Sequence, residues 1–130
     1  MTEASLDITV DGRTVSVSHP DKVLFLALDV CPVYCRYCTR SYSIGGGTEE
    51  VDKVGFRASS DRWEAAFRYI EENDTVEDVV VSGGDLSLLA ARRLRVIGDR
   101  LLSIPHVRRI RLATKGLAVL PQKVLSDPDW

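Results

Sequence analysis

Val23-Leu-Phe-Leu-Ala-Leu-Asp-Val30 is a nearly continuous apolar run, and Cys31-Pro-Val-Tyr-Cys35-Arg-Tyr-Cys38 follows it directly. A short run that is rich in strand-forming residues predicts a strand buried on both faces, as parallel strands are. Sites in α/β proteins gather where such strands end. The cysteines therefore stand at a place in the predicted fold where chemistry is usually carried out.

Downstream of this segment, helical and strand patterns alternate. Residues 60–73 have helical periodicity with Ser60 as a candidate N-cap, 78–82 form a short apolar strand, 88–102 are again helical, and 107–112 form a third strand. The helix faces expected to cover the sheet carry Trp63, Ala66, Phe67 and Ile70, and then Leu89, Leu94, Ile97, Leu101 and Leu102. Alternation of this kind predicts parallel strands with right-handed crossovers. Since three strands do not close a barrel, the pattern predicts an α/β fold that is a partial barrel.

The N-terminal residues predict a separate small element. Residues 5–10 and 13–18 alternate in polarity around Asp11-Gly12, a pattern typical of a β-hairpin with a two-residue turn. We therefore expect residues 1–18 to form a hairpin extension. Residues 19–130 are expected to form the partial-barrel domain, incomplete at its C-terminal end.

Composition excludes several classes of protein. The 130 residues contain 17 basic and 19 acidic side chains, for a net charge of −2, so charge favours neither nucleic acid nor membrane binding. No apolar run reaches the roughly 20 residues that span a bilayer. The N-terminus has no apolar segment of the signal-peptide type, so a cytoplasmic location is expected.

The three cysteines are the strongest chemical signal in the sequence. They fall within eight residues with the spacing C-x3-C-x2-C, unlike the even and scattered cysteines of secreted disulfide scaffolds. Thiolates are soft ligands that suit iron–sulfur clusters. Because a [4Fe–4S] cluster has four irons, Cys31, Cys35 and Cys38 would leave one iron open to a small molecule.

Other interpretations of the cysteines fit less well. A structural zinc site needs four ligands, and His19 and His106 lie far away in the sequence. His106 stands at the start of the third predicted strand, where a structural role is expected. A redox-active thiol pair would need only two of the three cysteines.

The cysteine motif, with the aromatic Tyr37 directly before its last cysteine, resembles the radical S-adenosylmethionine (SAM) superfamily. Five further segments resemble lysine 2,3-aminomutase and its relatives and occur in the same order: Pro20–Leu26, Cys35–Arg40, Val80–Asp85, Ile104–Val107 and Val119–Gln122. The resemblance implies a barrel of the radical SAM type, of which this chain corresponds to the early part.

The resemblance also implies roles at the cofactor site. Tyr37 would contact the adenine of SAM, and the turn Ser82-Gly83-Gly84-Asp85 would hold its methionine part. By itself, this turn would suggest only a strand-to-helix connection with Asp85 as a helix cap. Three segments that follow predicted strands, at the cysteines, at this turn and at Thr114, should meet on one face. Lys115 beside Thr114 is not distinguishable from a surface lysine.

Two more positions match binding residues of the resembling family. Arg40 corresponds to an arginine that meets the carboxylate of the amino acid substrate. Lys22 corresponds to a basic residue that helps to bind pyridoxal phosphate. Ser18, however, stands where the family has a second basic residue, and the family's Schiff-base lysine belongs to a segment that this sequence does not contain.

The function implied is a radical SAM isomerase that uses a [4Fe–4S] cluster, SAM and pyridoxal phosphate for a 1,2-amino shift on an amino acid. Its cluster would need an electron donor, and an open sheet predicts a homo-oligomer or a partner that completes the barrel. One alternative is a radical SAM enzyme of another reaction type without pyridoxal phosphate. Another is a cluster-binding fragment without catalysis.

Overall fold

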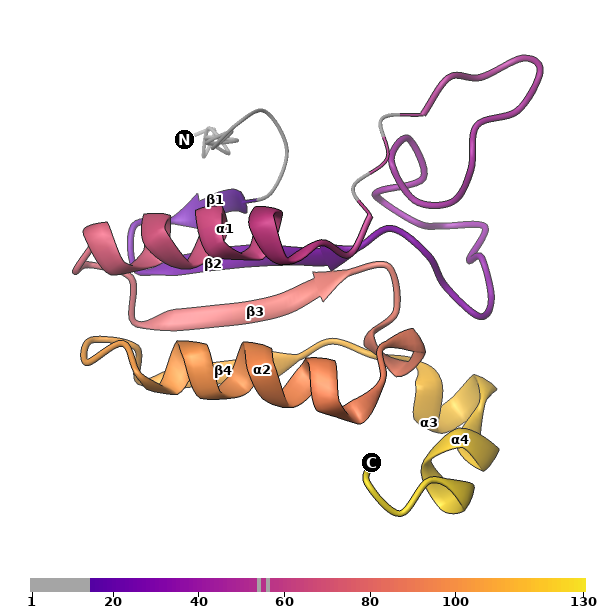
Figure 1. The fold of residues 1–130 in the computed structure, drawn as a ribbon. Coiled ribbons are helices and arrows are strands. Elements are labelled where there is room, and N and C mark those ends of the chain that lie inside the picture. Colours follow the sequence, from indigo (N-terminus) through magenta and orange to yellow (C-terminus); the bar gives the residue numbers. More distant parts are fainter. Residues whose placement is uncertain (1–14, 54, 56) are drawn as a thin grey trace.

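The computed structural model describes residues 15–130 except 54 and 56, and it contains one mixed sheet with helices (Figure 1). The strands are β1 (Val15–His19), β2 (Lys22–Leu28), β3 (Asp78–Gly83) and β4 (Arg109–Leu112). The helices are α1 (Ser60–Glu72), the short 3-10 helix η2 (Leu86–Leu88), α2 (Ala91–Leu102), α3 (Gly116–Val119) and α4 (Pro121–Ser126). The strand order in the sheet is β1-β2-β3-β4.

The pairing of β2, β3 and β4 confirms the predicted parallel α/β arrangement. β2 pairs with β3 in parallel and β3 pairs with β4 in parallel. The C-terminal ends of the parallel strands lie at one end of the sheet. The long loop after β2 and helices α3 and α4 lie at that same end (Figure 1). The chain therefore brings its predicted site segments to one end of the sheet.

β1 pairs with β2 in the antiparallel direction, which the sequence did not predict. Pro20 and Asp21 form the tight turn of this hairpin. Most of the predicted hairpin over residues 5–18 lies outside the described residues. The proposed boundary between residues 18 and 19 stays a prediction.

The hydrophobic core lies between the sheet and the two longer helices. All four residues predicted for the inner face of α1, Trp63, Ala66, Phe67 and Ile70, are buried. Phe67 packs edge-on against Phe25 of β2, with ring centroids 5.4 Å apart. The N-cap of α1 is Ser59 rather than Ser60, because the Ser59 hydroxyl accepts the hydrogen bond from the backbone N–H of Arg62.

The predicted helix 88–102 is divided. Asp85 caps η2 by accepting from the backbone N–H of Ser87, and the chain then turns before α2 begins at Ala91. Ile97 and Leu101 are buried as predicted, but Leu102 is 71% exposed. Leu102 follows directly after Leu101 and so points about 100° away from it around the helix.

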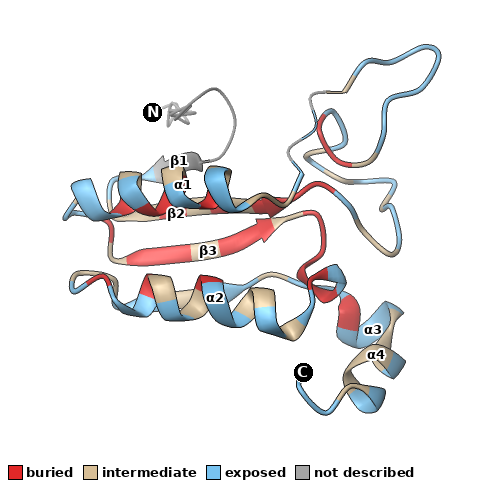
Figure 2. Ribbon diagram, in the orientation of Figure 1, coloured by how far each residue is buried: buried red, intermediate tan, exposed pale blue. Residues whose placement is uncertain are grey.

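The two faces of the sheet differ. Val23, Phe25 and Ala27 of β2 are buried beneath the helices, whereas the intervening Leu24 and Leu26 are only half-buried. The prediction of a strand buried on both faces is therefore wrong for β2. β3 is buried along most of its length (Figure 2).

At the N-terminal ends of the parallel strands, opposite the cysteines, ionic contacts connect β3 with β4. The carboxylate of Asp78, fully buried at the start of β3, accepts from Arg111 at 2.6 Å and lies 3.8 Å from Arg109. His106 contacts the carbonyl oxygen of Ile70 at 2.9 Å through its Nε2 atom, in agreement with a structural role. No helix in the described part of the chain is long and apolar enough to cross a membrane.

Candidate functional site

The cysteine loop begins directly after β2 and projects from the edge of the sheet where the parallel strands end (Figure 1). Its base is closed by a hydrogen bond of 2.7 Å from the backbone N–H of Gly45 to the carbonyl of Asp29. Within the loop, the N–H of Cys38 donates to the carbonyl of Cys35 at 3.1 Å and forms a turn. All three cysteines are half-buried and free of disulfide bonds. The loop therefore keeps three thiols available at the predicted place.

The electrostatic environment links these thiols to the glycine turn after β3. Burial raises the pKa of Cys31, and the negative charge of Asp85 raises it further. Charges on Cys38 and Cys35 act in the same direction, while the backbone N–H of Asp85 acts against them by hydrogen bonding to the thiol. Cys31 is thus a neutral thiol near pH 7, and a metal that binds it must displace a proton.

The glycine turn packs directly against the chain that enters the cysteine loop. The backbone N–H of Gly84 donates to Leu28 at 2.5 Å, and that of Asp85 donates to Val30 at 2.9 Å. Gly83 has a φ of +110°, which favours glycine. A Cβ on Gly84 would lie 2.1 Å from the carbonyl oxygen of Val30. At Gly84, the close approach that glycine permits is therefore made to the protein's own backbone.

Asp85 joins three segments at this edge of the sheet. Its side chain, 7% exposed, accepts from the N–H of Ser87 at 2.8 Å, the hydroxyl of Thr114 at 2.5 Å and the N–H of Lys115 at 2.7 Å. Burial by itself would raise the pKa of Asp85, but these hydrogen bonds outweigh it and lower the pKa. A buried carboxylate with all these donors stays ionised and fixes the turn to the end of β4.

Lys115 is the residue at this site that sequence reasoning missed. Its Nζ atom donates to the Sγ atom of Cys35 at 3.2 Å and to the hydroxyl of Tyr37 at 2.5 Å, and it lies 4.6 Å from the centre of the Tyr37 ring. The hydrogen bonds to Tyr37 and Cys35 raise the pKa of Lys115. Its position at the end of the third predicted strand was the only signal in the sequence.

The other predicted residues are distributed more widely. Ser82 is buried at the end of β3, next to the glycine turn. Arg40 lies in the cysteine loop, and nothing in the described part of the chain hydrogen-bonds its buried Nε atom. Lys22 begins β2, at the opposite end of the strand from the cysteines, and its Nζ atom lies 3.6 Å from the carboxylate of Asp21. The structure therefore separates Lys22 from the rest of the predicted set.

The donor set suits a cluster better than a single hard ion. Over residues 15–130, with 54 and 56 excepted, no group of three or more His, Cys, Asp or Glu side chains is arranged to hold a metal ion. Three thiols on one projecting loop nevertheless have the chemistry that iron–sulfur clusters require. Binding of a cluster would draw the three sulfur atoms together and so couple cluster assembly to the order of the loop.

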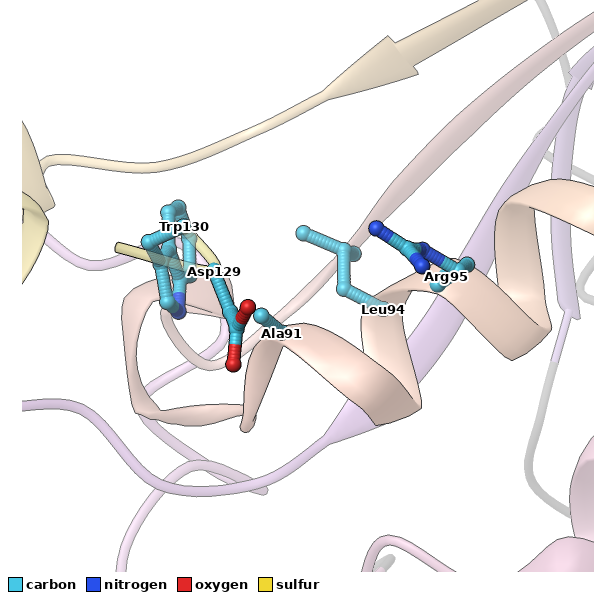
Figure 3. A pocket seen from close by; sticks show the side chains of 5 residues that line it. All are labelled: Ala91, Leu94, Arg95, Asp129 and Trp130. Atoms are coloured by element: carbon cyan, nitrogen blue, oxygen red, sulfur yellow. The ribbon is translucent and has the colours of Figure 1, made fainter. Parts of the chain in front are cut away.

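A shallow cavity of about 260 Å³ lies elsewhere, between α2 and the C-terminal residues (Figure 3). It is lined by Ala91, Leu94, Arg95, Asp129 and Trp130. None of the predicted site residues lines it, so it has no part in the site at the cysteine loop.

Comparison with known proteins identifies the relatives of the chain, although no family model matches it. It is 38% identical over 109 residues to L-lysine 2,3-aminomutase of Fusobacterium nucleatum, covering 84% of this chain and 24% of that protein. It is 36% identical over 127 residues to L-lysine 2,3-aminomutase of Clostridium subterminale, covering 96% of this chain and 29% of that protein. Glutamate 2,3-aminomutase of Clostridioides difficile is 34% identical to this chain over 121 residues, which are 93% of this chain and 27% of that protein. The chain thus spans about a quarter of the length of these relatives, and over most of its own length it is similar in sequence to the lysine 2,3-aminomutase family.

Proposed function

We propose that this chain binds a [4Fe–4S] cluster through Cys31, Cys35 and Cys38, binds SAM at the open iron, and contributes this centre to a 1,2-amino shift on an amino acid. One observation carries the proposal: the cysteine loop, the glycine turn and the end of β4 meet at one edge of the sheet, joined by the hydrogen bonds of Asp85. The relatives, named as lysine and glutamate 2,3-aminomutases, support the reaction class.

The protein contributes thiolate ligands to the cluster, and each thiol releases its proton when it binds iron. When bound, a reduced [4Fe–4S] cluster would supply the electron that cleaves SAM into methionine and a 5′-deoxyadenosyl radical, and this radical would remove a hydrogen atom from the substrate. Cys31 loses its proton on binding iron, against the burial and the negative charge that raise its pKa. Because the loop is half-exposed, an external electron donor can approach it.

The proposed SAM site uses the glycine turn and Tyr37. Both carboxylate oxygens of Asp85 already accept hydrogen bonds, so Asp85 holds the shape of the turn. Contacts with the methionine part of SAM then fall to Ser82, to the backbone of Gly83 and to the carbonyl of Gly84, because the Gly84 N–H already donates to Leu28. Tyr37, which is 77% exposed, offers a ring face for stacking on adenine.

Arg40 is the proposed partner of the substrate carboxylate. Its Nε atom is buried and has no hydrogen-bond partner in the described part of the chain. A buried guanidinium N–H without a partner is costly, and a bound carboxylate would satisfy it with a charge-assisted hydrogen bond. Such binding would place an amino acid beside the cysteine loop.

A second candidate function keeps the cluster and SAM but does without pyridoxal phosphate. Lys22, the proposed contact to the cofactor phosphate, lies a seven-residue strand away from the cysteine loop and is already close to Asp21. At about 3.3 Å per residue, that separation is roughly 20 Å. This distance favours a radical reaction that does not use pyridoxal phosphate at the cysteine loop.

The first test is anaerobic reconstitution with iron and sulfide, followed by analysis of both elements. The wild-type chain should bind about four irons and four sulfides, as a cubane cluster requires. Cys31→Ser, Cys35→Ser and Cys38→Ser should each lose most of this iron while retaining their circular dichroism spectra. A variant that keeps a full complement of iron would exclude that cysteine as a ligand.

The second test addresses the reaction. The reconstituted chain is mixed with a strong reductant, SAM, pyridoxal phosphate and L-lysine or L-glutamate, and NMR is used to detect a 3-amino acid. Formation of that product supports the aminomutase function. Cleavage of SAM without such a product, equally fast without pyridoxal phosphate, would instead support the second candidate.

A further inference from the structure

The contact between Lys115 and the cysteine loop joins residues 80 positions apart in the sequence. Its Nζ atom donates to the Sγ atom of Cys35 at 3.2 Å and to the hydroxyl of Tyr37 at 2.5 Å. One ammonium group therefore bridges two positions of the loop, on either side of Arg36. Of the three cysteines, Cys35 is the one whose sulfur accepts this hydrogen bond.

The backbone that carries Lys115 is held rigidly, which gives this contact its significance. The buried carboxylate of Asp85 accepts from the N–H of Lys115 at 2.7 Å, and the hydroxyl of Thr114 accepts from the N–H of Gly116 at 2.8 Å. A Cβ on Gly116 would lie only 2.3 Å from that of Ser87, so the strand end is packed tightly against η2. The ammonium thus extends from a fixed base to the cysteine loop.

We propose that Lys115 is a positioning residue that fixes the Cys35–Tyr37 segment and, when a cluster is bound, raises the cluster's reduction potential through its hydrogen bond to the Cys35 sulfur. The second half of the proposal rests on the proposed function, and the first half does not. A thiolate that ligates iron retains lone pairs that can accept this hydrogen bond.

The physical basis is the charge change on reduction. Adding an electron makes the cluster and its thiolates more negative, so a nearby ammonium that donates to a ligand sulfur stabilises the reduced state more than the oxidised state. Hydrogen bonds to cluster sulfurs are an established means of tuning the potential. Lys115 brings both a positive charge and an N–H donor to Cys35.

The first experiment uses the cluster-free chain and measures amide hydrogen exchange. Lys115→Met should increase the exchange rate of the Cys38 amide, which donates to the carbonyl of Cys35, at least tenfold, and Lys115→Arg, which keeps a charged donor, should restore most of the protection. Lys53→Met is the matched control, because Lys53 donates to the carbonyl of Ile44 at 2.8 Å in the same loop and not to a sulfur. Equal exchange of the Cys38 amide in Lys115→Met and the wild type would overturn the positioning role.

The second experiment measures the midpoint potential of the reconstituted chain by redox titration monitored by EPR. Lys115→Met should make reduction about tenfold less favourable, which is ~59 mV for one electron. Lys115→Gln, which retains a donor without the charge, should fall between Lys115→Met and the wild type, and Lys53→Met should match the wild type. An unchanged potential in Lys115→Met with an intact cluster would overturn the tuning role.

The two experiments separate failure of this inference from failure of the proposed function. If the wild-type chain assembles no cluster, both the proposed function and the role of Lys115 in tuning the potential are rejected. The exchange result in the cluster-free chain still decides the positioning role. If the cluster forms and only the potential is insensitive to Lys115, the proposed function stands and the tuning role is rejected.

Discussion

Two buried aspartates stand at the two ends of β3 and have very different partners. Asp78, at the start of the strand, is fully buried and contacts the guanidinium groups of Arg109 and Arg111 on the neighbouring strand. Asp85, just past the end of the strand, is 7% exposed and accepts from two backbone N–H groups and one hydroxyl. The first uses long side chains, whereas the second uses the backbone of the segments that it joins.

The difference indicates what each end of the sheet is organised to do. Arginine side chains can move or rehydrate without disturbing the backbone, so the contacts of Asp78 stabilise the pairing of β3 and β4 and little else. Backbone N–H groups cannot move without moving the chain, so Asp85 fixes the geometry of the glycine turn and of the base of Lys115. The geometry at the C-terminal end of β3 is therefore fixed by backbone hydrogen bonds, whereas the side-chain contacts at its N-terminal end can adjust.

Gly84→Ala should have the largest effect on stability, because it disrupts the turn after β3, where backbone hydrogen bonds fix the geometry. The added Cβ would lie 2.1 Å from the carbonyl oxygen of Val30, and only a backbone shift can relieve that clash. We expect a loss of about 3 kcal/mol or more in the free energy of unfolding, measured by urea denaturation. Gly98→Ala in α2, where nothing lies within 4 Å of the added Cβ, should instead stabilise by up to about 1 kcal/mol. A Gly84→Ala chain as stable as the wild type would refute the close approach.

Asp85→Ala should have the next largest effect, about 2–3 kcal/mol, because it leaves the N–H groups of Ser87 and Lys115 without their acceptor. It should also increase amide exchange at Lys115 and at residues 31–38, since the cysteine loop loses its fixed neighbour. Urea denaturation and hydrogen exchange measure the two effects. Exchange that rises equally in all parts of the chain would contradict a local role for Asp85.

Asp78→Ala should cost less, about 1–2 kcal/mol, although Asp78 is the more deeply buried carboxylate. Arg109 and Arg111 are more than half exposed, so water can solvate them when their partner is removed. Amide exchange in the cysteine loop should be unchanged. If Asp78→Ala disturbed that loop as much as Asp85→Ala, the two ends of the sheet would not be independent.

Acidification should produce the smallest effect, and it should be traceable to Asp85. The pKa of Asp85 is lower in the folded chain than its usual value of about 3.9. A depressed carboxyl pKa contributes stability that is complete above the unfolded-state pKa and is lost as the pH falls through the folded-state pKa. The wild type should therefore lose more stability between pH 4 and lower pH than Asp85→Asn does. Parallel curves of unfolding free energy against pH for the two proteins would contradict this.

The sequence predicted those features that depend on local patterns. Apolar runs identified β2 and β3, and helical periodicity identified the inner face of α1, because burial there follows from spacing alone. The hairpin of β1 and β2 was missed, because Pro20-Asp21 indicates a turn equally well with or without strand pairing across it. The position of Asp85 as a cap was accessible from the pattern, but its contacts with Thr114 and Lys115 were not.

Lys115 illustrates the limit of local patterns most clearly. Its contact with Cys35 exists only because β4 pairs beside β3 and the cysteine loop returns over the same edge of the sheet. Neither residue carries a signal of the other in its neighbouring sequence. Strand order and loop path, which are tertiary properties, decide such contacts.

We expect the three cysteines to hold a cluster with one iron open to SAM. The most direct measurement is EPR of the anaerobically reconstituted and reduced chain, recorded with and without SAM. We predict a [4Fe–4S]⁺ signal whose g-values and line shape change when SAM is added. A cluster signal that SAM leaves unaltered would contradict an open iron that binds SAM, and a chain that assembles no cluster would contradict the three cysteines as its ligands.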